Sequence, residues 1–295
     1  MSNFSFAFHP LKCGMVVAQI LATSALILTA TCPANAAEVV PDFYASGFGW
    51  QHAPNASGKN FDPPPPGAPG AAGPIGAHPN HPHVGNGTPG QAATPRIGND
   101  GSPLLLPWAA ENMKKTRLAI EAGGVPFDPA ARCWPGGVPA VVSFANQPME
   151  ILQTPDLVVL LYERGQVARR IYMNRPHAQN LTPTWYGESV GHYENGDTLV
   201  IDTIGMTDKS FVDVFNVPHT KALHIIERYK IIDGGNKIEL VITVDDPQTF
   251  TQTWSVMKLM EPSRERVGEV LCQVGNDDVY NQGLRPVPTA ATPDY

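Results

Sequence analysis

The residues with the clearest chemical potential in this chain are one carboxylate and one arginine in its C-terminal half. In the run Leu223–Ile232, strict alternation places Glu227 and Tyr229 on the more apolar face of a strand. A carboxylate on such a face must be paired, hydrogen-bonded or shifted in pKa, because burial penalises its charged form. Arg169 or Arg170 is the expected partner. Such a Glu–Arg pair has three alternative roles. It could orient a polar group of a substrate, its carboxylate could act as a general base, or the pair could be a purely structural ion pair.

Histidines of the same region are candidates for proton transfer. They are His177, His192, His219 and His224. No two of them are spaced as a helical H-x-x-x-H pair and no cysteine lies beside them, so we predict no metal site there. We expect Glu227 to serve as base or orienter and Arg169 to pair with an oxyanion or carboxylate. His177 or His192 would transfer a proton, although each histidine alone also fits an ordinary loop or surface position.

The segment Gly187–Thr203 has two incompatible interpretations. Residues 187–191 fit the G-x-S-x-G pattern of a hydrolase nucleophile elbow, which would make Ser189 an acyl nucleophile. In an elbow a helix must follow the serine, whereas Asn195-Gly196 and an alternating strand follow here. We therefore predict a glycine-hinged β-hairpin in this segment.

From Met149 onward the pattern is that of β-strands joined by short turns. The expected strands are Leu157–Tyr162, Val167–Met173, Val190–Glu194, Thr198–Ile204, Leu223–Ile232, Lys237–Asp245, Phe250–Met260 and a short Glu269–Val274. Because no helices intervene, we predict a mainly β fold, either an antiparallel, lipocalin-like β-barrel or a sandwich. One N-terminal helix is expected over Leu104–Ala122, with Pro107 in its first turn and glycines at its end.

Aromatic side chains on these strands are the expected wall of a ligand cavity. Those selected as binding residues are Tyr172, Tyr193, Tyr229 and Trp254. Rings of this kind suit an aromatic or otherwise hydrophobic small molecule, although filling a core is their more frequent role. No cofactor is expected.

The N-terminus has the features of a secretory signal peptide over residues 1–36. Lys12 precedes an apolar run, and small residues lead to a cleavage site after Ala36. The apolar run is too short and too close to this site for a membrane span, and Thr31 before Cys32 is a poor lipoprotein signal. The mature protein is thus expected in the periplasm or outside the cell, without membrane association.

Three further regions complete the expected organisation. Residues 37–103 are rich in proline and glycine and are predicted to form an extended arm, 104–285 the barrel domain, and 286–295 a flexible tail. The arm contains His78-Pro-Asn-His81-Pro-His83, three histidines that could bind a transition metal. The alternative is a flexible polar tract, because the prolines prevent the helical spacing that would preorganise metal ligands.

The cysteines and the net charge limit the chemistry further. Once the signal is removed, Cys133 and Cys272 form an even pair, which suggests a disulfide in an exported protein, with two separate buried thiols as the alternative. The net charge is −7, and no run of basic residues occurs. Nucleic acids and anionic membrane surfaces are therefore excluded as expected partners.

Several motifs occur in order along the chain and resemble those of one protein family. They are Cys133-x-Pro135-x-Gly137-x-Pro139, Gln153-Thr-Pro155, Arg169-x-Ile171-Tyr172, Arg175-x-His177, Gly187-x-Ser189-Val-Gly191, Gly196-Asp-Thr-Leu-Val-Ile-Asp-Thr203, Pro218-His219, Glu227-Arg-Tyr229 and Asp246-Pro247. Together they resemble a family of exported bacterial proteins of unassigned function with a G-x-S-x-G-x-W-E-G-D-T-L-V-V-D-T signature. Here Tyr193 replaces the usual Trp, His192 takes a place often held by Arg, and Asn195 lengthens the turn. The resemblance implies a fold and a compartment but no reaction.

These features lead to two functional hypotheses from different classes. The first is an exported β-barrel that binds a hydrophobic or aromatic small molecule, with or without activity as a cofactor-independent lyase, isomerase or hydrolase. The alternative is a non-catalytic binding or scaffold protein of the cell envelope, contacting its partner through the arm. The sequence specifies neither the ligand nor the oligomeric state.

Overall fold

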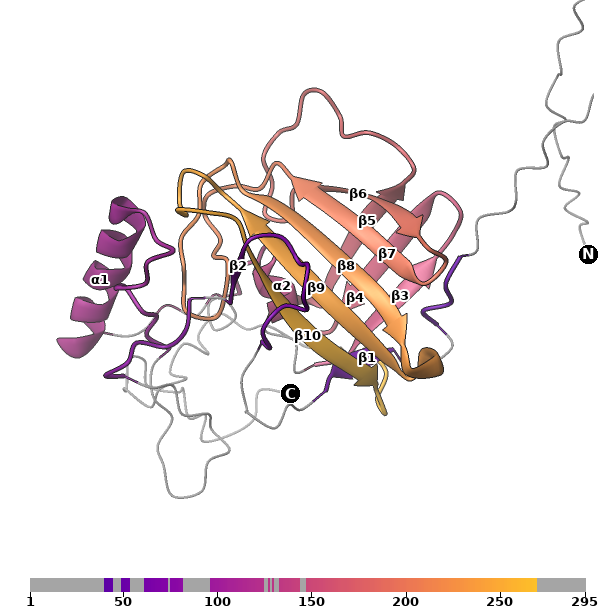
Figure 1. Cartoon of the computed structure of the whole chain (residues 1–295), viewed down its shortest axis with the longest axis horizontal. Coiled ribbons are helices and arrows are strands. Elements are labelled where there is room, and N and C mark those ends of the chain that lie inside the picture. Colours follow the sequence, from indigo (N-terminus) through magenta and orange to yellow (C-terminus); the bar gives the residue numbers. More distant parts are fainter. Residues whose placement is uncertain are drawn as a thin grey trace, which may run out of the picture. The chain divides into compact units, whose positions relative to one another are not determined.

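Alternating apolar and polar residues build a β-sheet that closes on itself (Figure 1). The computed structural model describes residues 40–44, 49–53, 61–73, 75–81, 96–124, 127, 129, 133–143 and 147–269. The predicted signal peptide, the tail, His83, Cys272 and nearly all of the expected strand Glu269–Val274 lie outside these residues. No helix within the described ranges is both long and apolar enough to cross a membrane.

Nine strands form the closed ring in the described part of the chain. The strands are β1 (Trp50–His52), β3 (Met149–Gln153), β4 (Leu157–Tyr162), β5 (Val167–Met173), β6 (Glu188–Glu194), β7 (Thr198–Ile204), β8 (His224–Ile232), β9 (Lys237–Asp245) and β10 (Trp254–Pro262). They follow one another around the ring in this order, and β1 closes it by pairing with β10 (Figure 1). A short strand β2 (Ala71–Ala72) adds in parallel to β10. The prediction of a mainly β barrel is confirmed.

Most predicted strand bounds agree with the structure because the inward-facing residues recur with a period of two. The bounds of β4, β5, β7 and β9 are those expected from the sequence. The last strand begins at Trp254 rather than at Phe250, because the Phe250 amide donates a hydrogen bond to the Asp246 carbonyl in the turn before it.

Within the closed ring, the expectation of purely antiparallel pairing fails between one pair of neighbouring strands. Strands β5 and β6 run parallel, and they pair only through Ile171–Met173 and Ser189–Gly191. Parallel neighbours cannot be joined by a tight hairpin, so segment 174–187 carries the chain back to the end of the barrel where β5 began. Strand periodicity alone carries no signal for this crossing.

The described parts of residues 37–103 belong to the barrel, which corrects their interpretation as a separate arm. Phe43, Trp50 and Ile75 are buried, and β1 hydrogen-bonds to both β10 and β3. The Trp50 indole N–H donates to the Phe43 carbonyl oxygen at 2.7 Å. A few apolar anchors thus fix this segment, although its average composition resembles that of an unfolded linker.

The helix expected over Leu104–Ala122 is confirmed as α1 (Pro107–Glu121). Pro107 occupies its first turn, where a missing N–H costs no hydrogen bond, and Gly123 follows its end at a φ of 91°. A second, short helix α2 (Ala140–Ser143) precedes β3, and two 3₁₀ turns, η2 (Arg164–Gln166) and η3 (Asp233–Gly235), connect β4 to β5 and β8 to β9.

Candidate functional site

Five polar side chains meet inside the barrel and are called the interior cluster here: Arg169, Ser189, Thr203, Glu227 and Tyr229. Arg169 Nη2 donates to Glu227 Oε2 at 2.5 Å and to Thr203 Oγ1 at 2.7 Å. Arg169 Nε donates to Ser189 Oγ at 3.1 Å, and the Tyr229 hydroxyl donates to Glu227 Oε1 at 3.0 Å. The predicted pairing of Arg169 with Glu227 is therefore present, on strands β5 and β8.

Burial and pairing hold the charges of this cluster in place. The side chains of Arg169 and Glu227 are 1% and 0% exposed. Desolvation opposes the charge on Arg169, but the Glu227 carboxylate raises the guanidinium pKa above its ordinary value. Burial and the same carboxylate raise the pKa of Tyr229 well above its ordinary value, and burial raises that of the neighbouring Tyr162 to about 12. Both phenols therefore stay protonated at physiological pH.

Access to the interior cluster from the barrel lumen is blocked by packing. A lumen cavity wide enough for a ligand would leave accessible surface on the side chains around it, yet Glu227 and Tyr229 have none. Of the predicted binding residues, Tyr193, Tyr229 and Trp254 belong to the buried core, whereas Tyr172 lies on the outer face. The structure therefore does not bring the four together around one cavity, and three of them fill the core.

A second cluster lies on the outer face of the same strands and is called the outer cluster: His177, Glu188, Asp202 and His224. His177 Nδ1 lies 3.1 Å from Glu188 Oε2, and its Nε2 lies 3.0 Å from Asp202 Oδ1. His224 Nε2 lies 2.9 Å from the same Asp202 oxygen. Because a neutral imidazole has one N–H, His177 donates both hydrogen bonds only when both its ring nitrogens carry protons.

The pKa values of the outer cluster follow from these contacts. Partial burial works against its carboxylates, but the amide of Ala178 and the His177 ring lower the pKa of Glu188, and both histidines lower that of Asp202. Asp202 in turn raises the pKa of His224. The cluster therefore binds segment 174–187 to the outer wall of the barrel through charge-assisted hydrogen bonds.

The predicted catalytic set is divided between the two faces, which corrects the expectation that it would converge. Arg169 and Glu227 point inward, whereas His177 belongs to the outer cluster. His192 is also on the surface, with its side chain 52% exposed and its Nε2 3.1 Å from Glu194 Oε1. The two-residue period of the strands sends Arg169 of β5 and Glu227 of β8 inward but His192 of β6 outward. His177 lies on segment 174–187, outside any strand, so alternation does not position it.

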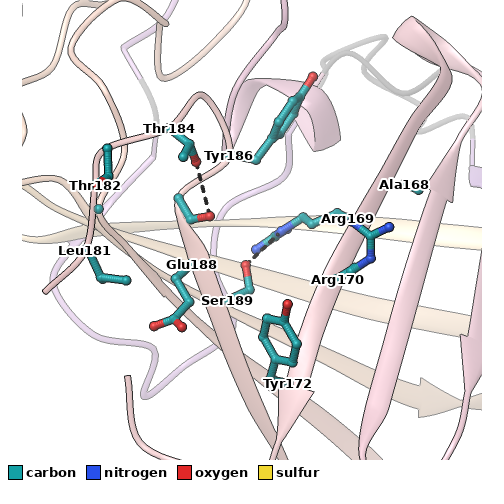
Figure 2. Close-up of a pocket in the computed structure, with 12 residues that line it drawn as sticks. Ala168, Arg169, Arg170, Tyr172, Leu181, Thr182, Thr184, Tyr186, Glu188 and Ser189 are labelled. Atoms are coloured by element: carbon teal, nitrogen blue, oxygen red, sulfur yellow. Dashed lines mark hydrogen bonds between the residues drawn. The ribbon is translucent and has the colours of Figure 1, made fainter. Parts of the chain in front are cut away.

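A cleft of about 340 Å³ opens where β5 and β6 separate (Figure 2). Strand β6 hydrogen-bonds only to the C-terminal half of β5. The N-terminal half of β5 therefore has no strand paired to its edge that faces β6. The lining residues are Ala168, Arg169, Arg170, Tyr172, Leu181, Thr182, Thr184, Tyr186, Gly187, Glu188, Ser189 and Gly205. Arg169 and Ser189 of the interior cluster therefore reach the cleft through the gap between the strands, together with outward-facing Arg170 and Tyr172.

One polar atom of Arg169 is left without a partner. Its Nη1 is buried and has no hydrogen-bond acceptor among the residues that the structure describes. A buried donor without an acceptor costs free energy, which an incoming oxygen would recover.

Sequence reasoning identified Arg169 but missed most of the cleft, because Leu181, Thr182 and Tyr186 lie on an irregular segment without periodicity.

The G-x-S-x-G segment owes its glycines to packing. Gly187 has a φ of 63°, and a Cβ atom there would lie 2.3 Å from the Ile204 carbonyl oxygen. A Cβ on Gly191 would lie 2.7 Å from Ile171 Cγ2, where β5 and β6 approach. Strands β6 and β7 form the predicted hairpin, with Asn195 and Gly196 at positive φ in its turn. Ser189 therefore serves the interior cluster and not a nucleophile elbow.

No protein-family model matches the chain, and no curated protein matches it. The resemblance to exported bacterial proteins accordingly stays a proposal.

The Cys133–Cys272 disulfide also stays a prediction, because Cys272 lies outside the described residues. His78 and His81 face the carboxylates of Asp100 and Glu121 at 3.5 and 3.0 Å, and within the described ranges no group of three or more ligating side chains could hold a metal ion.

Proposed function

We propose that this chain is an exported small-molecule-binding β-barrel whose ligand is an organic anion with an aromatic or otherwise hydrophobic part. The observation that supports the proposal most is the position of two arginines, Arg169 and Arg170, in one cleft of about 340 Å³. This volume lies at the lower end of the range for small-molecule sites. The ligand is thus assigned to the gap between β5 and β6 rather than to the barrel lumen.

The lining of the cleft favours a carboxylate as the anionic group. Arg169 is fixed by Glu227 and Ser189, and its Nη1 still needs an acceptor. A guanidinium N–H without an acceptor binds a carboxylate oxygen more strongly than a neutral acceptor. Thr182 and Thr184 add hydroxyl groups to the same wall.

An aromatic part of the ligand would find matching surfaces beside the arginines. Tyr172 presents a ring to the cleft, and the Arg175 guanidinium lies 3.8 Å from the centre of that ring. Leu181 and Tyr186 complete the apolar contact surface.

The described parts of residues 37–103 pack into the barrel, which lowers the support for the alternative of a scaffold protein that binds its partner through a free arm.

The proposal is tested by identifying what the protein retains and by removing Arg170. Full-length protein purified from a periplasmic fraction is denatured, and released compounds are identified by mass spectrometry. Aromatic carboxylates are then titrated calorimetrically into the wild type and into Arg170→Ala. We expect Arg170→Ala to weaken binding at least about tenfold, because a charge-assisted hydrogen bond is lost.

Arg228→Ala is the matched control. Arg228 is an outward-facing arginine of β8 that pairs with Glu194 at 2.6 Å and does not line the cleft. We expect this variant to bind as the wild type does. Release of only neutral compounds, or equal losses for the two arginine variants, would overturn the assignment.

A further inference from the structure

The edge of β5 that borders the cleft carries backbone groups that no strand covers. Strand β6 pairs with β5 only through Ile171–Met173, so Ala168 and Arg170 lie beyond the ladder. Both residues are exposed and line the cleft of about 340 Å³, and Figure 2 shows them on the strand at its border. What this edge can bind depends on the direction in which its N–H and C=O groups point.

Two hydrogen bonds establish which residues of β5 point their backbone toward the cleft. The Met173 amide donates to the Asp156 carbonyl at 3.0 Å, on the side of β4. The next amide, that of Asn174, donates to the Gly191 carbonyl at 2.8 Å, on the side of β6. Because the backbone groups of successive residues alternate between the two edges of a strand, the even-numbered residues of β5 face the β6 side.

Three backbone groups at this edge therefore lack a hydrogen-bond partner within the described chain. The Arg170 carbonyl belongs to the first rung of the parallel ladder, where Ile171 lies opposite Ser189. The Arg170 N–H and both the N–H and the C=O of Ala168 remain, and no bond between described residues reaches them from the cleft side. Unpaired groups of this kind are a template for a further strand.

The opposite wall of the cleft turns its own backbone away from this edge. The Thr184 amide donates to the Gly205 carbonyl at 3.1 Å, and the Thr184 carbonyl accepts from the Thr207 amide at 2.8 Å. These bonds hold segment 174–187 against the chain that follows β7, while Leu181 of the same segment lines the cleft. The edge is thus walled on its far side. A single extended chain fits such a gap, whereas a strand that already belongs to another sheet would meet the wall.

We propose that the cleft binds the C-terminal end of an extended peptide, which adds as a strand to the open edge of β5. A peptide N–H donates to the Ala168 carbonyl, and two peptide carbonyls accept from the Ala168 and Arg170 amides. The terminal carboxylate lies at the side chains of Arg170 and Arg169, whose Nη1 has no acceptor among the described residues. An apolar side chain of the peptide packs on Tyr172 and Leu181. This inference names the ligand class of the proposed anion site and rests on that proposal.

Hydrogen exchange on the wild-type, full-length protein tests the backbone contacts without any substitution. The probe is acetyl-Gly-Ala-Phe with a free carboxylate, and exchange of single amides is followed by NMR. We expect the Ala168 and Arg170 amides to exchange at least about tenfold more slowly with saturating peptide than without it. The Met173 amide, which is already bonded to Asp156, is the matched control and should not change. Unchanged exchange at Ala168 and Arg170 in the saturated complex would overturn the proposal.

A series of ligands separates this inference from the proposed carboxylate site. Phenylpropionate carries the aromatic ring and the carboxylate but no peptide backbone, and the amides of acetyl-Gly-Ala-Phe are N-methylated one at a time. By calorimetry we expect phenylpropionate to bind at least about tenfold more weakly than the peptide, with a similar loss on methylation of one amide but not of its neighbours. Equal binding of peptide and phenylpropionate, or equal losses at every amide, overturns the strand addition and leaves the carboxylate site standing. Binding of neither compound overturns both.

Ala168→Pro removes one of the three groups from the protein side. Proline suits this position because the preceding Val167 is extended, with φ −94° and ψ 128°, and because the Ala168 N–H takes no part in the pairing with β4. Ala168→Ser keeps the N–H and is the matched comparison. We expect the peptide to bind Ala168→Pro about fivefold more weakly than Ala168→Ser. Equal affinity of the two variants, both shown to be folded by circular dichroism, would contradict the proposed hydrogen bond.

Discussion

The interior and outer clusters are built on the same strands but differ in their access to water. On β6 and β7, Ser189 and Thr203 face inward while their neighbours Glu188 and Asp202 face outward. The interior cluster pairs one arginine with one carboxylate where neither is solvated, whereas the outer cluster joins two histidines and two carboxylates at the surface. The difference teaches that one β-ribbon can carry a charge pair that fixes the structure and, one residue away, groups that respond to pH.

The largest expected effect comes from breaking the interior pair. Glu227→Leu leaves the Arg169 guanidinium buried without its counter-charge, and we expect the free energy of unfolding to fall by about 3–5 kcal/mol. Urea denaturation followed by fluorescence measures this loss. The double variant Arg169→Met/Glu227→Leu should be more stable than Glu227→Leu alone, because no uncompensated charge remains. Additive losses in the double variant would contradict the description of the two residues as a coupled pair.

An intermediate effect is expected at Asp213, a buried carboxylate that lacks a cationic partner in the described structure. Its Oδ1 accepts hydrogen bonds from the Phe215 and Val217 amides at 2.9 and 3.4 Å, while Oδ2 has no partner within the described ranges. Burial raises the pKa of Asp213 from 3.8 to about 7. Asp213 thus shows what happens to a buried carboxylate without the guanidinium that Glu227 has.

The sign of the pH dependence follows from proton binding. Between pH 3.8 and about 7 the folded protein keeps the Asp213 proton, whereas the unfolded chain has released it. The contribution of protonated Asp213 to the free energy of unfolding is therefore complete below pH 3.8 and is lost as pH rises to about 7. We expect Asp213→Asn to remove this loss and to stabilise the protein at pH 8 by about 2–4 kcal/mol relative to the wild type, with a smaller difference at pH 5. Urea denaturation at both pH values measures it, and a difference independent of pH would contradict the assignment.

The smallest effect is expected in the outer cluster. Asp202→Asn should cost about 0.5–1 kcal/mol, because solvent screens a pair that is partly exposed. The pKa of His224 is raised in the folded protein, so its contribution to stability is lost as pH rises through that pKa. The pKa of Asp202 is lowered, so its contribution is lost as pH falls through that pKa. The cost should therefore be greater at pH 5 than at pH 8.

NMR titration of the His224 ring checks the same variant directly. In Asp202→Asn its pKa should fall toward 6.5, the ordinary value for histidine. His192→Ala is the control at the exposed pair with Glu194, and we expect it to change stability by less than about 0.5 kcal/mol. A pH-independent cost for Asp202→Asn would show that the outer cluster acts through packing rather than charge.

Strand alternation accounts for what the sequence could predict. It located β4, β5, β7 and β9, and it placed Glu227 on the inward face, where burial then required a partner such as Arg169. The same period sends Glu188 and Asp202 outward, but their meeting with His177 depends on segment 174–187, whose path has no periodic pattern. The role of β1 was also hidden, because a three-residue strand in a proline-rich region has too few residues to show alternation.

The parallel pairing of β5 and β6 has a consequence that concerns parity. Strand directions around a closed ring can alternate throughout only when the number of strands is even, and nine strands close the ring in the described chain. One mismatch is therefore obligatory, wherever it falls, just as one pair of neighbours must agree in any odd ring of alternating signs. Here it falls between β5 and β6, beside the cleft that holds the two arginines. The three residues of β1, by making the count odd, are thus the topological reason why one pair of neighbouring strands in the ring runs parallel.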